Sequence, residues 1–74
     1  MLRNSLHKAL WAKYEAEKAE AEATLEVYFA NSVGIGEHPQ IVEEMSKQLE
    51  KLANAQDCLQ SLMSMKNKYE EGQD

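Results

Sequence analysis

The chain has 74 residues, with 13 acidic and eight basic side chains and a formal net charge of −5. That length allows one domain with a thin core, which proteins of this size usually reinforce with disulfides, a metal or a partner subunit. An intrachain disulfide is excluded because Cys58 is the only cysteine, and no apolar run approaches the length of a membrane span.

Residues 2–31 form the first predicted helix, because they are rich in Ala, Glu, Lys and Leu and contain no Gly or Pro. At 100° per residue, their apolar side chains fall into two stripes on nearly opposite sides. One stripe is small and consists of Ala9, Ala12, Ala16, Ala19, Ala23, Val27 and Ala30. The other is larger and consists of Leu10, Tyr14, Ala21, Leu25 and Tyr28, with Trp11 and Phe29 to one side. A helix that is apolar on two sides is expected to have two packing partners.

Residues 32–38 form the predicted corner, within the stretch N-S-V-G-I-G-E-H-P-Q. Its Gly-x-Gly lacks the third glycine, the preceding strand and the Lys-Ser/Thr of phosphate-binding loops. We therefore interpret a glycine as the exit from the first helix and Pro39 as the first position of the second. Val33 and Ile35 are predicted to plug the end of the helix pair or, if they are exposed, to form a tip for partner docking.

Residues 39–69 form the second predicted helix, and residues 70–74 a frayed tail. Apolar residues recur there at spacings of three and four, which approximates a heptad seam and predicts coiled-coil-like contact. Gln56 falls near the centre of that stripe. The predicted seam consists of Val42, Met45, Leu49, Leu52, Leu59, Leu62 and Tyr69, with Ala55 and Lys66 between them.

The short corner makes the two helices antiparallel neighbours, so the predicted fold is an all-α, coiled-coil-like hairpin in a single domain, residues 1–74. One hairpin buries only one stripe of the first helix, which leaves the other to a partner. We expect a homodimer, with two hairpins forming a four-helix bundle. The sequence leaves open which stripe is intramolecular. The residues expected in the core or the interface are Leu10, Trp11, Tyr14, Ala16, Ala19, Ala23, Leu25, Tyr28, Leu49, Leu52 and Leu59.

No catalytic, cofactor or metal site is predicted. His7 and His38 are the only histidines, and neither has an obvious co-ligand. No neighbouring cation or histidine activates Cys58, and the Glu-x-x-His motif of di-metal bundles is absent. Metal-dependent assembly through Glu37 and His38 is the weaker alternative.

The run V-Y-F-A-N-S-V-G-I-G-E-H-P-Q-I-V-E-E, followed by L-E-K-L-A-N-A, resembles short helical-hairpin proteins of tailed phages of marine bacteria and of marine metagenomes. The resemblance covers roughly residues 25–62, and the V-G-I-G-E-H-P corner is its most distinctive part. That group has no established activity, so no catalytic or ligand residues are transferred. The resemblance implies a phage-encoded product in a bacterial cytoplasm or a virion.

Together these observations predict a non-enzymatic structural or protein-interaction module that associates with itself, with a second protein as a further partner. A small regulatory hairpin dimer that binds RNA or DNA is the alternative, although no segment is net basic and the lysines alternate with glutamates. The absence of a secretory signal and the single cysteine favour a cytoplasmic location.

Overall fold

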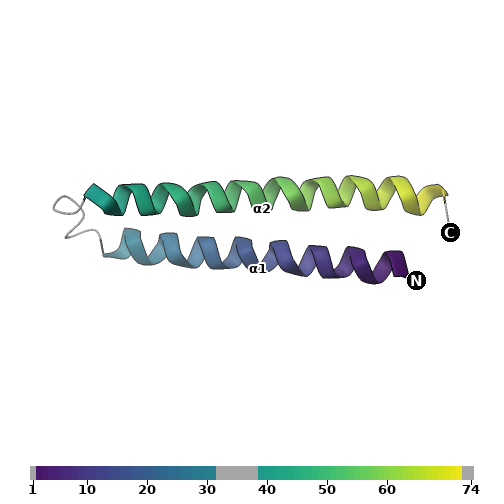
Figure 1. The fold of residues 1–74 in the computed structure, drawn as a ribbon, viewed down its shortest axis with the longest axis horizontal. Coiled ribbons are helices and arrows are strands. Elements are labelled where there is room, and N and C mark those ends of the chain that lie inside the picture. The colour runs from purple at the N-terminus through teal and green to yellow at the C-terminus, as the bar shows by residue number, and fades with distance from the viewer. Residues whose placement is uncertain (1, 32–38, 73–74) are drawn as a thin grey trace.

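The computed structural model describes residues 2–31 and 39–72, and the side chains of residues 4–31 and 40–66. Helix α1 spans Leu2–Ala30 and helix α2 spans Pro39–Gly72. The two helices lie side by side and run in opposite directions (Figure 1), and the described residues contain no strand. The predicted all-α hairpin is therefore confirmed.

The helix ends lie close to their predicted positions. Helix α1 ends one residue early, where the Asn31 backbone N–H donates to the Val27 carbonyl at 3.1 Å and the Asn31 side-chain amide donates to the same oxygen at 2.9 Å. These hydrogen bonds satisfy the Val27 carbonyl in the last turn of α1, where carbonyl groups lack N–H partners further along the helix. Helix α2 continues through Gly72, three residues into the predicted tail, because no Gly or Pro interrupts it between Gln40 and Glu71.

The helices meet along one seam, in which contacting residues recur at strict spacings of four and three. That pattern is typical of a two-helix coiled coil. All of the seam residues are buried or half-buried: His7, Trp11, Tyr14, Lys18, Ala21, Leu25 and Tyr28 of α1, and Ile41, Met45, Gln48, Leu52, Ala55, Leu59 and Leu62 of α2. The larger stripe of α1 is therefore the intramolecular one, and the alanine-rich stripe is exposed.

The seam of α2 differs from the predicted one at two positions. Val42 and Leu49 are 61% and 57% exposed, and Ile41 and Gln48 occupy the seam instead. A shift of one residue turns a side chain by about 100° around the helix, which moves it out of the contact. Gln56, expected near the centre of the seam, is exposed for the same reason.

The molecule is a thin rod with little interior. It measures 56 × 15 × 15 Å and has a radius of gyration of 16.8 Å, whereas a compact globule of this length would have about 11 Å. Among the described side chains the buried core consists of only Ala21, Leu25, Ala55, Leu59 and Leu62. Such a core is small even for a chain of this size.

Candidate interaction surface

The hairpin has two long sides that flank the seam. Residues directly before a seam residue turn to one side, and residues directly after it turn to the other. Because the helices run in opposite directions, the same step along either helix turns toward the same side of the hairpin. Each side can therefore be read as one surface built from both helices.

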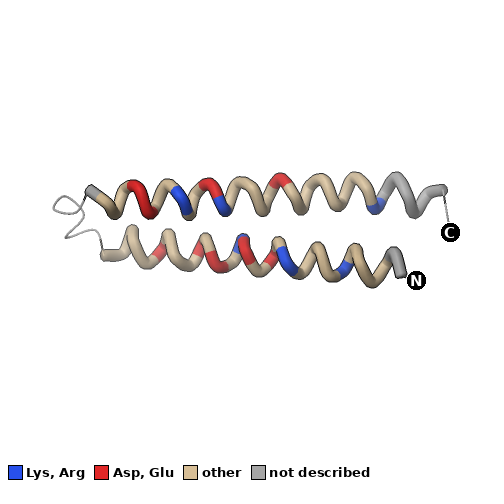
Figure 2. Tube along the Cα trace, viewed as in Figure 1, with Lys and Arg blue, Asp and Glu red and all other residues tan. Residues whose placement is uncertain are grey.

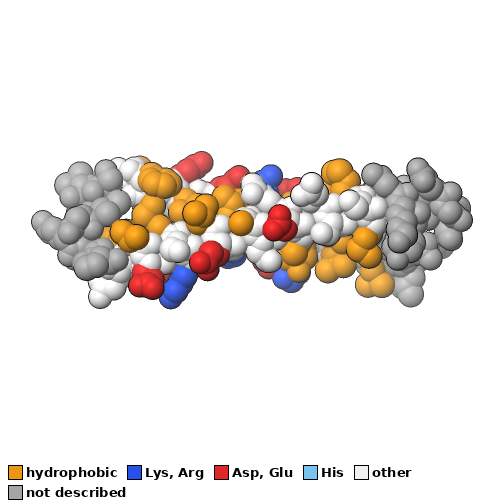
Figure 3. All heavy atoms as spheres, turned by 90° about the horizontal axis from the view of Figure 1, so that it is seen from above, with side chains coloured by type: hydrophobic (Ala, Val, Ile, Leu, Met, Phe, Trp, Pro, Cys, Tyr) orange, Lys and Arg blue, Asp and Glu red, His pale blue; other side chains and the backbone are white. Residues whose placement is uncertain are grey.

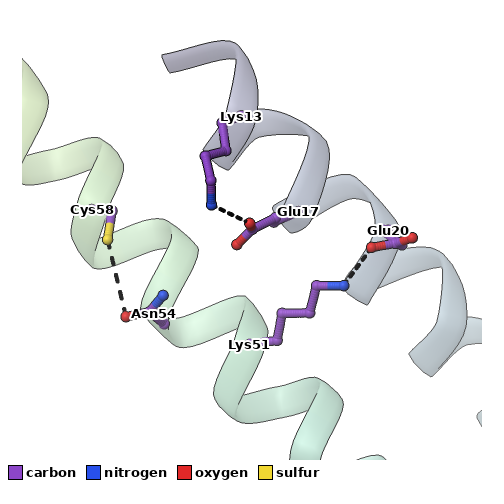
Figure 4. Close-up of polar contacts among 6 residues, drawn as sticks. All are labelled: Lys13, Glu17, Glu20, Lys51, Asn54 and Cys58. Carbon is purple, nitrogen blue, oxygen red and sulfur yellow. Dashed lines mark hydrogen bonds and ion pairs between the residues drawn. The ribbon is translucent and has the colours of Figure 1, made fainter. Parts of the chain in front are cut away.

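One side, here called the paired side, is built from the residues directly before seam positions and carries both ion pairs of the described residues, Lys13–Glu17 and Lys51–Glu20, and the hydrogen bond from Cys58 to Asn54 (Figure 4). Lys13 Nζ donates to Glu17 Oε2 at 2.7 Å within α1 and lies 4.6 Å from the centre of the Tyr14 ring. Lys51 Nζ donates to Glu20 Oε1 and so links α2 to α1. The paired side thus satisfies most of its charges within the chain.

These ion pairs shift the titration of two groups on the paired side. The hydrogen bond from Lys51, together with its positive charge, lowers the pKa of the Glu20 carboxyl below its ordinary value. The hydrogen bond to Glu17 raises the pKa of the Lys13 ammonium above its ordinary value. Both pairs lie at the surface, so each contributes little to stability. Only the Lys51–Glu20 pair joins the two helices.

A second cross-helix bond lies near the free ends of the helices. His7 Nε2 donates to the Leu62 backbone carbonyl at 3.0 Å, since a carbonyl oxygen can only accept. The His7 ring stacks on Trp11, with the ring centres 6.4 Å apart and an angle of 16° between the planes. His7 therefore acts as a structural clamp between α1 and α2, a role that sequence reasoning did not find because the bond spans 55 residues.

The seam contains one polar atom without a partner. Gln48 Oε1 is buried and accepts no hydrogen bond from the described residues. An unpaired polar atom of this kind costs about 1–3 kcal/mol. The sequence pattern favoured the adjacent Leu49 for this position, so Gln48 was missed.

The other side, here called the open side, is built from the residues that directly follow seam positions. By that definition all of its residues are exposed: Lys8, Ala12, Glu15, Ala19, Glu22, Glu26 and Phe29 of α1, and Val42, Ser46, Leu49, Ala53, Gln56, Gln60 and Met63 of α2. Its α2 half carries no charge, and Val42, Leu49 and Met63 are each more than half exposed. Figure 3, which looks down onto α2, shows hydrophobic side chains gathered toward both ends of the rod.

The residues predicted for the core or the interface divide into two groups. Leu25 and Leu59 are buried in the seam, and Trp11, Tyr14, Tyr28 and Leu52 are half-buried there. Leu10, Ala16, Ala19, Ala23 and Leu49 are exposed in the single chain. Val33 and Ile35, predicted as a corner plug, lie outside the described residues, as do Glu37 and His38.

Within the described residues, no group of three or more His, Cys, Asp or Glu side chains is arranged to hold a metal ion. Neither helix is long and apolar enough over its described part to cross a membrane. Cys58 is half-buried, and its thiol donates a hydrogen bond to Asn54 Oδ1 at 4.0 Å. The surface that calls for explanation is therefore the open side.

Comparison with known proteins adds no assignment: no protein-family model, curated protein or solved structure matches the chain. The resemblance to phage helical-hairpin proteins therefore stays an expectation drawn from the sequence.

Proposed function

We propose that this chain is a structural or protein-interaction module that associates with itself through exposed helix faces. The observation that supports this is the imbalance between its core and its surface. Among the described side chains, five small or aliphatic ones are buried, whereas eight large apolar ones are exposed: Leu6, Leu10, Val27, Phe29, Val42, Leu49, Met63 and Met65.

That imbalance is hard to reconcile with an isolated rod. Burial of apolar surface is the main favourable term in folding, at about 25 cal/mol per Å². A two-helix hairpin with five buried residues gains little of it and must still order two long helices. A dimer that forms a four-helix bundle would supply the missing burial, and closed two-fold dimers are the commonest way for soluble proteins to do so.

The alternative function, binding of nucleic acid, receives little support from the surface. In Figure 2, acidic and basic residues are interspersed along α2, and acidic residues outnumber basic ones on α1, so the coloured part of neither helix carries a basic stripe. Lys13 and Lys51 are already engaged by Glu17 and Glu20. The net charge of −5 would also oppose approach to a phosphate backbone.

In the cell, such a module would act as a scaffold: it would present two hairpins to each other and, through the remaining outer faces, to a second protein. If the resemblance to phage hairpin proteins holds, that scaffold would work in an infected bacterial cytoplasm or in a virion.

The solution mass tests the proposal. A chain of 8.4 kDa should give about 17 kDa by light scattering at micromolar concentration, in buffer near neutral pH. A mass of 8.4 kDa at all concentrations up to millimolar, with the helices intact by circular dichroism, would overturn it. A gel shift against mixed RNA and DNA at low salt gives the parallel test of the alternative, and our proposal predicts no retardation.

A further inference from the structure

We propose that the open side is covered by a second copy of this chain, related by a two-fold axis perpendicular to the helices, with the two corners at opposite ends of the bundle. This inference rests on the proposed self-association and adds the contact face and the orientation.

The register within the hairpin fixes which residues share a level along the rod. The Lys51–Glu20 bond places those two residues at the same height. Each step forward along α1 then corresponds to one step backward along α2. Glu15 is therefore level with Gln56, Glu22 with Leu49, and Lys8 with Met63. The level of Glu15 and Gln56 is also the middle of the rod, because it lies within one residue of the midpoints of both helices.

A two-fold axis through that middle level gives the longest overlap of two hairpins. On α1, this axis places Lys8 of each copy opposite Glu22 of the other copy. The interface therefore contains two Lys8–Glu22 contacts between opposite charges. These charges take part in no ion pair among the described side chains, so they are free to pair between copies. Ala12 and Ala19, which also belong to this side, are small enough to let the two α1 helices approach.

The same axis brings the uncharged α2 half of the open side into contact with the α2 half of the second copy. Leu49 meets Met63 of the second copy on α2, and this contact occurs twice. Gln56 meets its own copy at the axis, where two side-chain amides can each donate and accept a hydrogen bond. The one unfavourable contact is Glu15 against its own copy, a like-charge pair at the two-fold axis.

The opposite orientation, with both corners at one end, matches the surfaces poorly. It would place α1 of one copy over α2 of the other, so that Glu15 would meet Gln56 and Glu22 would meet Leu49. Carboxylates would then lie against uncharged side chains without a partner, which is costly where water is excluded. The charge pattern therefore selects the arrangement with corners at opposite ends.

The paired side is the poorer contact face. Its charges Lys13, Glu17, Glu20 and Lys51 already pair within the chain, so they offer a second copy fewer unpaired charges, even though Leu6, Leu10 and Val27 are exposed on this side. The available area is adequate for a dimer on the open side, because one long side of a rod of 56 × 15 Å covers roughly 800 Å², close to the surface that each partner buries in a stable interface.

Disulfide cross-linking across the axis tests this arrangement. In a Cys58→Ser background, Gln56→Cys places one thiol from each copy at the axis, and mild oxidation should link most chains into covalent dimers. The matched control is Asn54→Cys in the same background, since Asn54 is exposed on the paired side, two residues away. We expect its cross-linking to be at least tenfold slower. Equal rates, or a faster reaction at position 54, would overturn the assignment of the open side.

Charge reversal tests the pairing independently. Glu22→Lys should weaken dimerisation about tenfold, because two attractive contacts become two Lys–Lys contacts. Lys8→Glu should do the same, and the double variant Lys8→Glu/Glu22→Lys should restore the wild-type dissociation constant to within about twofold. A double variant weaker than either single variant would overturn the pairing. A monomeric wild-type chain would overturn self-association itself, whereas a dimer that fails these tests would overturn only this arrangement.

Discussion

The two long sides of the hairpin have the same length and the same underlying helices, yet they differ in how their side chains are satisfied. On the paired side, Lys13 forms an ion pair with Glu17, and Lys51 forms an ion pair with Glu20 across the two helices. The open side keeps its α1 charges outside any such bond among the described residues, and its α2 half is uncharged. Charged side chains that already pair within the chain favour a face exposed to solvent. Unpaired charges beside exposed apolar side chains favour a face that contacts a partner.

The largest loss of stability is expected from a substitution in the seam, because the contact between α1 and α2 holds both long sides of the hairpin together. Leu25→Asp places a carboxylate in the buried contact between the helices, and an uncompensated charge there costs roughly 3–5 kcal/mol. We expect most helical signal in circular dichroism to be lost, and assembly with it. The sequence left open whether the stripe that contains Leu25 is intramolecular, and the structure places Leu25 within the chain's own core.

Leu6→Asp is the matched control for that substitution. Leu6 is 60% exposed in the first turns of α1, where an acidic residue interacts favourably with the helix dipole. Its helical signal should stay at the wild-type level. Equal losses in both variants would contradict the assignment of the seam.

The next effect is a gain in stability. Gln48→Leu replaces a seam residue whose buried Oε1 has no hydrogen-bond partner, so removing the polar group should stabilise the fold by about 1–2 kcal/mol. Thermal unfolding should show a higher Tm with the same oligomeric mass. A lower Tm would mean that the Gln48 amide is satisfied in the assembly and helps to specify it.

A smaller effect, on the affinity of the dimer, is expected for a charge substitution on the open side and not for one on the paired side. Glu15→Gln removes the single like-charge contact across the proposed axis and should tighten the dimer about twofold. Glu17→Gln, its counterpart on the paired side, removes the ion-pair partner of Lys13 and should leave dimerisation unchanged. Sedimentation equilibrium of both variants would measure this, and equal changes would erase the distinction between the sides.

The smallest effect concerns the paired side and depends on pH. The pKa of Glu20 is lowered in the folded state, so the Lys51 pair contributes stability above the ordinary carboxyl pKa and loses it as the pH falls through the lowered value. Lys51→Met should therefore lower Tm by about one or two degrees at pH 7, and the difference should disappear once the pH is low enough to protonate Glu20 in the folded state. A difference that persisted in acid would show that the stem of Lys51 stabilises by contact alone.

Periodicity and composition were enough to predict the hairpin, its antiparallel direction and its helix ends to within a few residues. They did not predict correctly which α2 residues face α1, because two neighbouring rows of residues on α2 both contain apolar side chains. Leu49 is more hydrophobic than Gln48, yet the strict spacing set by Leu52, Ala55 and Leu59 assigns the seam to Gln48. Similarly, both stripes of α1 are apolar, and only the contact with α2 decides which is internal. The division into a paired and an open side depends on cross-helix bonds, which a linear pattern does not contain.

The central claim is that the hairpin completes its fold with a second copy, and the concentration dependence of thermal unfolding tests it most directly. For a dimer of this size, Tm should rise by about 4 °C for each tenfold increase in chain concentration, since association and folding are then one equilibrium. Cooperative unfolding with the same Tm across a hundredfold range of concentration would contradict the claim.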